Sequence, residues 1–235
     1  MRKTFYLLAG ILFTVAAAQA QKQETIEGNG NLVIKDVPVT SFESLKASGV
    51  YELKLSQGSK EAVKIEADEN LQQYFNVHNE GNQLVIEMKD LKDKNLKLKS
   101  KMRVYVSFKN LKELDLKTVG NVAADAPLAF TDLDIKNKSV GKIDLALTAS
   151  KLNLSNNSVG DIKLSGKAQS AVVTNRGVGH LQAGDFVVQT LNIDNSGVGS
   201  AEVNAEKTLI VKDNMLGRVK NKGNAAVKKN NRVEI

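Results

Sequence analysis

Three side chains of the types used in acid–base catalysis recur at a nearly even interval in the C-terminal half of the chain. They are Asp161, His180 and Glu202. If the chain returns to the same place at this interval, Asp161 can orient the His180 imidazole, and a glycan-active lyase or hydrolase could use the cluster. Charges of alternating sign on neighbouring strands are also favoured by strand pairing alone. The pattern therefore has a structural explanation as well.

A second set of positions indicates binding. Lys142, Lys163, His180 and Arg218 occupy outward positions at a similar interval. A ladder of such side chains gives an extended polar face that a glycan or an envelope protein can contact. The predicted loops are only a few residues long, whereas enzymes of this kind work in a cleft built by long loops. An adhesin-like protein without enzymatic activity is the first hypothesis; a polysaccharide-active enzyme or a purely structural envelope protein is the alternative.

Composition excludes several kinds of active site. The chain has no cysteine and only two histidines, His78 and His180. Cysteine catalysis, thiolate metal sites and histidine-rich metal sites are therefore ruled out. The sequence has no P-loop, no Gly-x-Ser-x-Gly motif and no Rossmann fingerprint, because Gly28-Asn29-Gly30 precedes a predicted strand where a helix would be needed. We expect no cofactor and no metal ion.

The element that positions these residues is a repeated phrase of the form (Thr/Ser/Gly)-Val-Gly. It ends at Gly120, Gly141, Gly160, Gly179 and Gly199, and a decayed copy, Met-Leu-Gly, ends at Gly217. The phrase recurs at a near-constant period of about 20 residues, which is typical of a solenoid. In a solenoid each repeat buries its apolar side by stacking on its neighbours.

Apolar and polar residues alternate around each of these glycines. The residues six before and two after it are apolar in every repeat, as Leu154 and Ile162 are around Gly160. The odd positions between them carry polar side chains such as Lys136, Ser155 and Thr174. Alternation with period two predicts strands, so we expect a parallel β-helix with coils of about 20 residues, stacked at about 4.8 Å. Leucine-rich repeats have a similar period, but their consensus and helical half are missing.

The residue four positions before the glycine is asparagine in four consecutive repeats. The predicted corners combine Asn137 with Gly141, Asn156 with Gly160, Asn175 with Gly179, and Asn195 with Gly199. Both residue types tolerate a positive φ angle and suit a tight bend. Stacked coils would align the asparagine amides as a ladder. We predict a structural role for these corner residues; the alternative is that the amides line a binding groove.

The first half of the chain is less regular than the second. We expect divergent β-coils or a cap over residues 31–117 and regular coils over residues 118–235, within one continuous domain. Strands are predicted at 62–67, 83–88 and 102–108, a short helix at 68–75, a turn at 79–82, an exposed loop or frayed edge at 90–101, and a polar terminal cap at 219–235. A cap would cover the sheet edge and the apolar end that a first coil leaves open.

The N-terminus has the pattern of a secretory signal peptide. Two basic residues precede an apolar stretch from 5 to 18, and Ala18-Gln19-Ala20 provides a cleavage site after Ala20. We therefore expect residues 1–20 to be removed, a flexible lead-in at 21–30, and no transmembrane segment in the mature chain. The predicted location is exported: the periplasm, the outer surface or the medium.

The mature chain is mildly basic. Removing Arg2 and Lys3 lowers the formal charge from +7 to +5, since 31 basic residues then face 26 acidic ones. We expect no nucleic-acid partner, because an exported chain rarely meets nucleic acid and the sequence has no recognition motif or basic aromatic platform. The lysines serve solubility and edge protection, or they attract acidic glycans or an anionic envelope surface.

Four features resemble one protein family. They are the predicted signal peptide, the Phe-x-x-Leu-x-Ala-Ser-Gly-Val segment at 42–50, the Leu84-Val85-Ile86 strand after Glu80-Gly81-Asn82, and the repeated corners. Together they resemble the putative auto-transporter adhesin family with a head GIN domain, over residues 32–234. The resemblance implies a right-handed parallel β-helix and an exported envelope or surface protein of a Bacteroidetes-type bacterium. It brings no catalytic residues.

Overall fold

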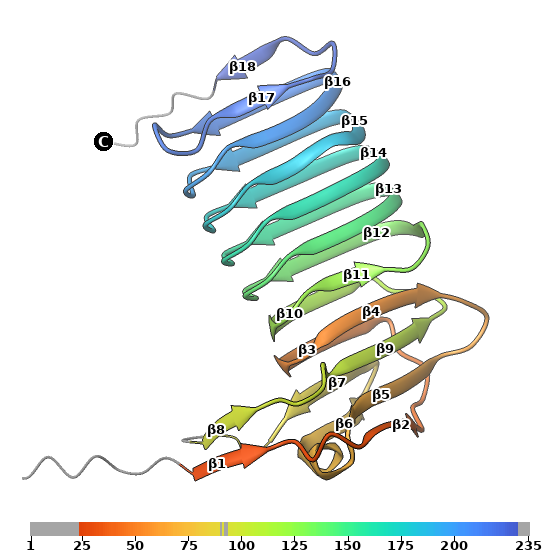
Figure 1. Cartoon of the computed structure of the whole chain (residues 1–235). Helices are drawn as coiled ribbons and strands as arrows, with labels where there is room; N and C mark the ends of the chain where they lie inside the picture. The colour runs from red at the N-terminus through yellow and green to blue at the C-terminus, as the bar shows by residue number, and fades with distance from the viewer. Residues whose placement is uncertain (1–23, 90, 92–93, 230–235) are drawn as a thin grey trace, which may run out of the picture.

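The computed structural model describes residues 24–89, 91 and 94–229. The predicted signal peptide and the first residues of the predicted lead-in lie outside this part of the chain. The chain is all-β, with 68% strand and 3% helix, and it winds into about six stacked parallel turns. Figure 1 shows these turns as a column that ends in β17 and β18 on one side and in an N-terminal region of different texture on the other. The predicted parallel β-solenoid is confirmed.

Five long strands form the regular part of the column. They are β12 (Leu128–Asn137), β13 (Ile143–Asn156), β14 (Ile162–Asn175), β15 (Leu181–Asn195) and β16 (Ala201–Asp213). Each pairs in parallel with the next, so that Leu154 lies between Ile135 and Val173. The pairing of β13 with β14 skips Ser150. One long strand and one corner therefore make a coil, and the skipped residue divides the strand into two halves.

The inward columns fill the interior as the alternation predicts. In the column of Leu154, the side chains from Leu114 to Val211 are at most 5% exposed. In the column of Ile162, those from Val122 to Ala201 are at most 3% exposed. One continuous apolar core thus runs along the column, and the burial of this apolar surface is the main stabilising contribution.

The asparagines of the corners form the predicted amide ladder. The Nδ2 of Asn137 donates to the Oδ1 of Asn156 at 2.8 Å, Asn156 donates to Asn175 at 2.7 Å, and Asn175 donates to Asn195 at 2.6 Å. All four side chains are at most 5% exposed. Asn195 ends the ladder by donating to the backbone oxygen of Gly217 at 2.8 Å. The amides are buried and bind one another, which supports the predicted structural role; Asn137 alone of the four also lines a hollow described below.

The corner glycines are required by both conformation and space. Gly160 has a φ angle of +137°, and a Cβ atom there would lie 2.2 Å from the backbone oxygen of Gly141. Gly141 has a φ angle of +140° and stands in the same relation to Gly120. A positive φ angle disfavours any residue with a side chain, and the stacked coils leave no room for one. The predicted bend is therefore confirmed at these corners.

The first half of the chain contains true coils. β3 (Ser44–Val50) and β4 (Glu52–Gln57) pair in parallel with β10 (Glu113–Val119) and β11 (Val122–Ala124), respectively. On their other side, β3 pairs in parallel with β7 (Gln83–Met88), and β4 with β9 (Arg103–Phe108). The chain therefore forms its first coil with β3 and β4. It continues on one side of this coil with β7 and β9, and then returns to the other side with β10 and β11.

Antiparallel strands close the N-terminal end. β2 (Leu32–Val37) pairs with β5 (Ala62–Asp68), β5 pairs with β9, and β6 (Phe75–Glu80) pairs with β7, all antiparallel. The 3₁₀ helix η1 (Glu69–Tyr74) connects β5 to β6. The predicted strands, short helix and turn are confirmed, although the helix is 3₁₀. These strands, together with β7, β8 and β9, form the region that we call the N-terminal cap.

Two expectations for the N-terminal half are corrected in part: the flexible lead-in at 21–30, and the exposed loop or frayed edge at 90–101, which contains a short strand. Residues 24–27, predicted as part of a flexible lead-in, form β1 (Glu24–Glu27), which pairs in parallel with β8 (Lys94–Lys97) in the predicted loop. Ile26 lies beside Leu96 and is 7% exposed in the core. Lys94 and Lys97 form ion pairs with Glu24 and Glu27 at 3.2 and 3.1 Å. The polar composition of residues 24–27 suggested a flexible segment. The burial of Ile26 and the cross-strand ion pairs instead hold it in a strand.

The C-terminal segment continues the column with short strands. β17 (Val219–Asn221) and β18 (Val227–Lys229) both pair in parallel with β16. The predicted polar terminal cap at 219–235 thus contains strands that continue the coil pattern through residue 229. Within the described ranges, no helix has the length and apolar character needed to cross a membrane.

Candidate binding faces of the solenoid

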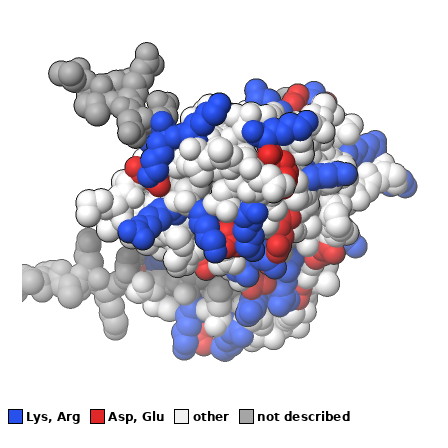
Figure 2. Space-filling model, turned by 90° about the horizontal axis from the view of Figure 1, so that it is seen from above, with Lys and Arg blue, Asp and Glu red and all other residues white. Residues whose placement is uncertain are grey.

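Each coil turns two outward faces to solvent, one on either side of its corner. The post-corner face holds outward residues directly before and within the first strand halves: Lys142, Asp144, Asp161, Lys163, His180, Gln182, Ser200, Glu202, Arg218 and Lys220. The pre-corner face holds outward residues within and directly after the second strand halves: Glu113, Asp115, Lys117, Asp134, Lys136, Lys138, Asn153, Ser155, Asn157, Val172 and Thr174. Seen from above, Lys and Arg side chains project around the molecule with Asp and Glu between them (Figure 2).

The predicted catalytic pair on the post-corner face does not form. Asp161 and His180 are neighbours, but it is the backbone N–H of His180 that donates to the Oδ1 of Asp161, at 2.8 Å. The imidazole Nδ1 instead lies 3.0 Å from the Oγ of Ser200. A base in catalysis needs its ring oriented by its partner. In this arrangement Asp161 binds the backbone of the next coil, and no carboxylate of the described residues is hydrogen-bonded to the ring.

Glu202, the third predicted catalytic residue, is held in its charged form. Its carboxylate forms ion pairs with Lys222 at 2.7 Å and Lys220 at 3.9 Å. The hydrogen bond from Lys222 lowers the pKa of Glu202 below its ordinary value. A general acid of a glycosidase needs a raised pKa, so this environment is the opposite of what the reaction requires.

The predicted basic residues of this face are only partly brought together. Lys163, His180 and Glu202 line one shallow hollow of about 360 Å³. Lys142 and Lys163 share Asp144, at 3.6 and 4.0 Å, and Arg218 lies outside this hollow. Most charged groups of the post-corner face are thus engaged with one another.

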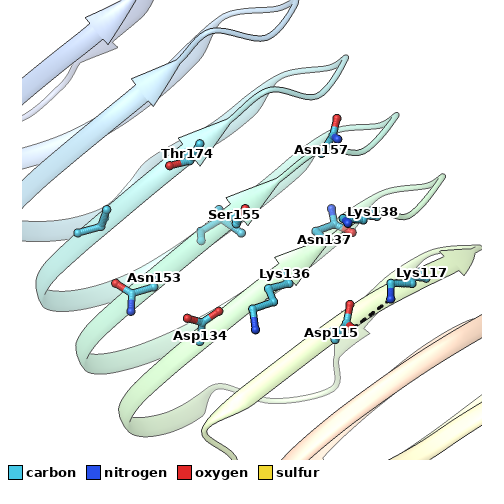
Figure 3. Close-up of a pocket in the computed structure, with 12 residues that line it drawn as sticks. Asp115, Lys117, Asp134, Lys136, Asn137, Lys138, Asn153, Ser155, Asn157 and Thr174 are labelled. Atoms are coloured by element: carbon cyan, nitrogen blue, oxygen red, sulfur yellow. Dashed lines mark ion pairs between the residues drawn. The ribbon is translucent and has the colours of Figure 1, made fainter.

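The pre-corner face has a hollow of about 390 Å³ that is open to solvent (Figure 3). Charged pairs border it on the side of β10 and β12. Lys117 binds Asp115 at 3.3 Å, and Lys136 binds Glu113 at 2.6 Å. The hydrogen bond from Lys136 lowers the pKa of Glu113, and the same bond raises the pKa of Lys136.

The middle of this hollow is neutral and hydrogen-bonding. Asn153, Ser155 and Asn157 on and after β13 lie beside Thr174 on β14 (Figure 3). None of these four side chains has a hydrogen-bond partner among the described residues. Their amide and hydroxyl groups offer donors and acceptors in rows that repeat at about 4.8 Å. The sequence analysis identified Ser155 and Thr174 only as outward residues. The missed signal was a run of neutral polar residues where neighbouring repeats carry charge.

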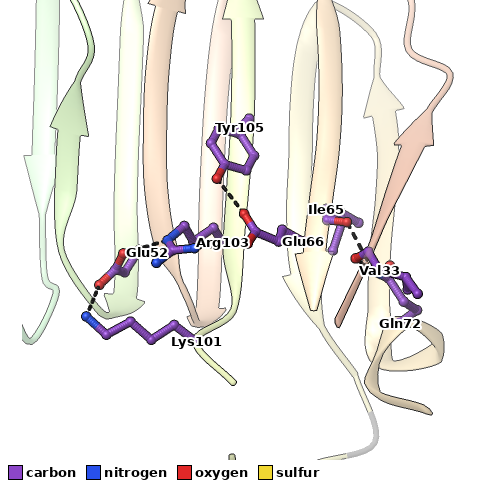
Figure 4. A network of polar contacts seen from close by, with 8 residues as sticks. All are labelled: Val33, Glu52, Ile65, Glu66, Gln72, Lys101, Arg103 and Tyr105. Carbon is purple, nitrogen blue, oxygen red and sulfur yellow. Dashed lines mark hydrogen bonds and ion pairs between the residues drawn. The ribbon is translucent and has the colours of Figure 1, made fainter. Parts of the chain in front are cut away.

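A third polar cluster lies in the N-terminal cap (Figure 4). Glu66 on β5 is 8% exposed and accepts hydrogen bonds from Tyr105 at 2.5 Å and from Arg103 at 2.9 Å. Arg103 also binds Glu52 on β4 at 3.2 Å. The bond to Glu66 raises the pKa of Tyr105. The cluster ties β4, β5 and β9 together through these hydrogen bonds, so we assign it a structural role.

The described ranges contain no group of three His, Cys, Asp or Glu side chains arranged to hold a metal ion. The two faces differ in the groups that they present to a binding partner. The post-corner face carries charges that are largely paired, whereas the middle of the hollow on the pre-corner face carries neutral groups that have no side-chain hydrogen bond among the described residues.

Comparisons with known proteins agree with the fold. Residues 41–225 match a family model described as "Putative auto-transporter adhesin, head GIN domain". A search of curated proteins gives no match. The solved structure of a putative adhesin from Bacteroides fragilis is similar, with a TM-score of 0.75 and 27% identity, over 87% of this chain and 100% of that chain. A putative adhesin from Parabacteroides merdae has a TM-score of 0.59 and 27% identity, over 88% of this chain and 95% of that one.

A further solved structure shares the fold. It is described as a putative lipid binding protein from Parabacteroides distasonis, with a TM-score of 0.66 and 20% identity, over 88% of this chain and 95% of that chain.

Proposed function

Because the chain belongs to the family described as "Putative auto-transporter adhesin, head GIN domain", we propose that it is an exported adhesin-like protein that binds a neutral glycan on its pre-corner face. The predicted signal peptide supports export. The observation that carries the proposal is the row of neutral side chains at Asn153, Ser155, Asn157 and Thr174, whose hydrogen-bonding groups have no partner among the described residues.

A glycan chain fits this surface chemically. Sugar hydroxyls both donate and accept hydrogen bonds, as amides and hydroxyls do. An extended polymer can contact several coils in turn, because equivalent positions recur at about 4.8 Å. Lys136, engaged by Glu113, and Lys117, engaged by Asp115, frame the hollow. The other two charged residues of its lining, Asp134 and Lys138, have opposite signs. A neutral chain therefore suits the middle of the face better than an acidic one.

Two features of the post-corner face support a role without catalysis. The His180 ring is not oriented by Asp161, and Lys222 lowers the pKa of Glu202. Lyases and hydrolases act in clefts, whereas both hollows here are shallow and built on short corners. The related solved structures described as adhesins point the same way.

The test uses the chain from Gln21 to Ile235, which contains every described strand, and a panel of immobilised polysaccharides. Dextran, amylopectin and galactomannan represent neutral chains; alginate and polygalacturonate represent acidic ones. We expect binding to at least one neutral polymer, with the affinity lowered at least about tenfold in Asn153→Ala/Ser155→Ala/Asn157→Ala. Asn192→Ala, the same residue type in the same column but outside the hollow, is the matched control and should bind normally.

Catalysis is measured in the same samples. Polymer length is recorded before and after incubation, for the unchanged chain and for Asp161→Ala/His180→Ala. Binding without shortening supports the proposal. Shortening that is lost in the double variant would replace it with a polysaccharide-active enzyme, and binding that the pre-corner variant leaves intact would refute the choice of face.

A further inference from the structure

The glycine and the asparagine of each corner are needed to form it, whereas the valine of the repeated phrase is not. Glycine supplies the φ angle and the close packing of backbones, and asparagine supplies the amide ladder. The valines are instead 49–54% exposed at Val119, Val140, Val159, Val178 and Val198. Consecutive valines are joined by parallel β-bridges, so they stack in one line, which we call the valine rib.

The rib is continuous along the regular column. Five equivalent positions at the ordinary strand spacing give a straight apolar line about 19 Å long. Leu216, which is 66% exposed, occupies the same position in the last corner and extends it. Isolated exposed valines need no explanation, but a row of them at every corner is an apolar surface that a soluble monomer does not need.

Both flanks of the rib carry an excess of positive charge, three cations on one side and two cations with one carboxylate on the other. The residues two before each apolar position are Lys117, Lys138, Asn157, Arg176, Ser196 and Asn214, and those two after it are Asn121, Lys142, Asp161, His180, Ser200 and Arg218. Five of these side chains are cationic and one is a carboxylate. That carboxylate, Asp161, already accepts the backbone N–H of His180 at 2.8 Å.

Three of the flanking cations are not neutralised. Lys138, Arg176 and Arg218 have no ion-pair partner within 4.0 Å in the part of the chain that the structure describes. Lys117 and Lys142 pair with Asp115 and Asp144 at 3.3 and 3.6 Å, at exposed positions where such pairs are weak. The rib is therefore an apolar line whose flanks carry five cations and one carboxylate, with neutral side chains between them.

This combination selects one kind of partner. A second copy packed rib to rib would bring like charges together, and a free polysaccharide has no use for an apolar ridge. A lipid surface with anionic headgroups offers both an acyl boundary for the valines and negative charge for the flanks. We propose that the valine rib docks the solenoid edge-on to an anionic lipid bilayer.

The geometry of the column is compatible with such docking. The five valines are joined in one line by parallel bridges, with the pre-corner face on one side of the line and the post-corner face on the other. The pre-corner face would then stand beside the membrane, where it remains accessible to a glycan. The two proposals rest on different main contacts, the exposed valines here and the neutral side chains of the pre-corner face there, although Lys117 and Lys138 on the flank of the rib also line the hollow.

The test is co-sedimentation of the chain from Gln21 to Ile235 with vesicles of phosphatidylcholine, with and without phosphatidylglycerol. Starting at Gln21 removes the apolar N-terminal stretch, which would itself bind lipid. We expect binding to the anionic vesicles only. Val140→Ser/Val159→Ser/Val178→Ser should weaken it at least about tenfold, since three apolar contacts are lost. Lys138→Gln/Arg176→Gln should weaken it about tenfold as well, and high salt should do the same.

The matched control is Val172→Ser, which replaces a valine that is 44% exposed on the pre-corner face, away from the rib. It should bind as the unchanged chain does. If the triple valine variant fails to fold, as judged by thermal unfolding, the charge variant decides the outcome.

Three results would overturn the proposal. The first is equal binding to neutral and anionic vesicles, or to neither. The second is normal binding by a folded rib variant. The third is a dimer in sedimentation velocity that the valine variant abolishes, which would assign the rib to a second copy of the chain.

Discussion

In the regular coils each residue meets its own equivalent, whereas in the N-terminal cap unlike residues meet. Asn156 hydrogen-bonds to Asn137 and Asn175, and Gly160 packs on Gly141. In the cap, Glu66 binds Arg103 and Tyr105 across antiparallel strands. A corner residue is therefore supported from both neighbouring coils and couples them, while a cap contact is made once.

The difference shows how the chain combines repetition with a defined end. Identical coils stack without limit, so the open edge of the first coil needs strands of another direction to cover it. The cap provides them at β5 and β6. We therefore expect substitutions in the corners to lower the stability of the whole column and substitutions in the cap to act locally.

The largest effect is expected for Gly160→Ala. The residue would have to keep a φ angle of +137° and would place its Cβ 2.2 Å from the Gly141 oxygen. Backbone strain and overpacking together should lower the free energy of unfolding by roughly 3 kcal/mol or more. Urea unfolding measures it. Gly81→Ala in the cap is the control: its φ angle is +60° with nothing within 4 Å, so the loss should be about 1 kcal/mol. Equal losses would remove the distinction.

Asn156→Ala should have the next largest effect. The change removes the hydrogen bonds to Asn137 and Asn175 and the one from Ser158, and it leaves buried polar groups without partners. We expect a loss of about 2–3 kcal/mol in urea unfolding. Asn157→Ala, one residue away and exposed, should change stability by less than about 0.5 kcal/mol. A loss of that small size in Asn156→Ala would show that the ladder does not couple the coils.

Glu66→Gln tests the local character of the cap. The amide keeps the shape of the side chain but weakens the charge-assisted bonds to Arg103 and Tyr105, so stability should fall by about 1–2 kcal/mol. Hydrogen exchange should show faster exchange in β5 and β9 and unchanged protection in β14 and β15. Faster exchange throughout the column would mean that the cap and the coils unfold as one unit.

The smallest effect concerns pH at the seam between the two regions. Glu113 binds Ser44 of the first coil and Lys136 of the regular coils, and the bond with Lys136 lowers its pKa below 4.5. Its stabilising contribution is therefore fully present above the unfolded value and is lost as the pH falls through the lower folded value. The side chain is 34% exposed, so the contribution is below about 1 kcal/mol.

This contribution is measured by urea unfolding at about pH 6 and about pH 3. The unchanged chain should lose slightly more stability over this range than Glu113→Gln does. An identical pH dependence of the two proteins would show that Glu113 does not contribute.

Most of the regular column could be predicted from the sequence. Every coil obeys one rule, so a single alternation around Gly160 fixes which residues face inward, and the buried Leu154 and Ile162 follow from it. The asparagine ladder could also be predicted, because stacking brings equivalent side chains together. Because residues one repeat apart lie on neighbouring coils, their contacts can be predicted from the spacing in the sequence.

The cap and the site were harder to predict for physical reasons. The pairing of Ile26 with Leu96 joins segments that lie far apart in the chain and share no pattern. For the predicted Asp161 and His180 pair, spacing correctly placed the residues side by side, but the carboxylate took the backbone N–H rather than the ring. Spacing fixes the position of a Cα atom and not the direction of a side chain.

The central claim is that the pre-corner face binds a neutral glycan. It is tested most directly by the side-chain amide NMR signals of the chain from Gln21 to Ile235, recorded with each polymer of the panel. The account predicts that a neutral polysaccharide shifts the signals of Asn153 and Asn157 and leaves that of Gln182 on the post-corner face unchanged. Shifts at Gln182 without shifts at Asn153 and Asn157, or no shift with any neutral polymer, would contradict it.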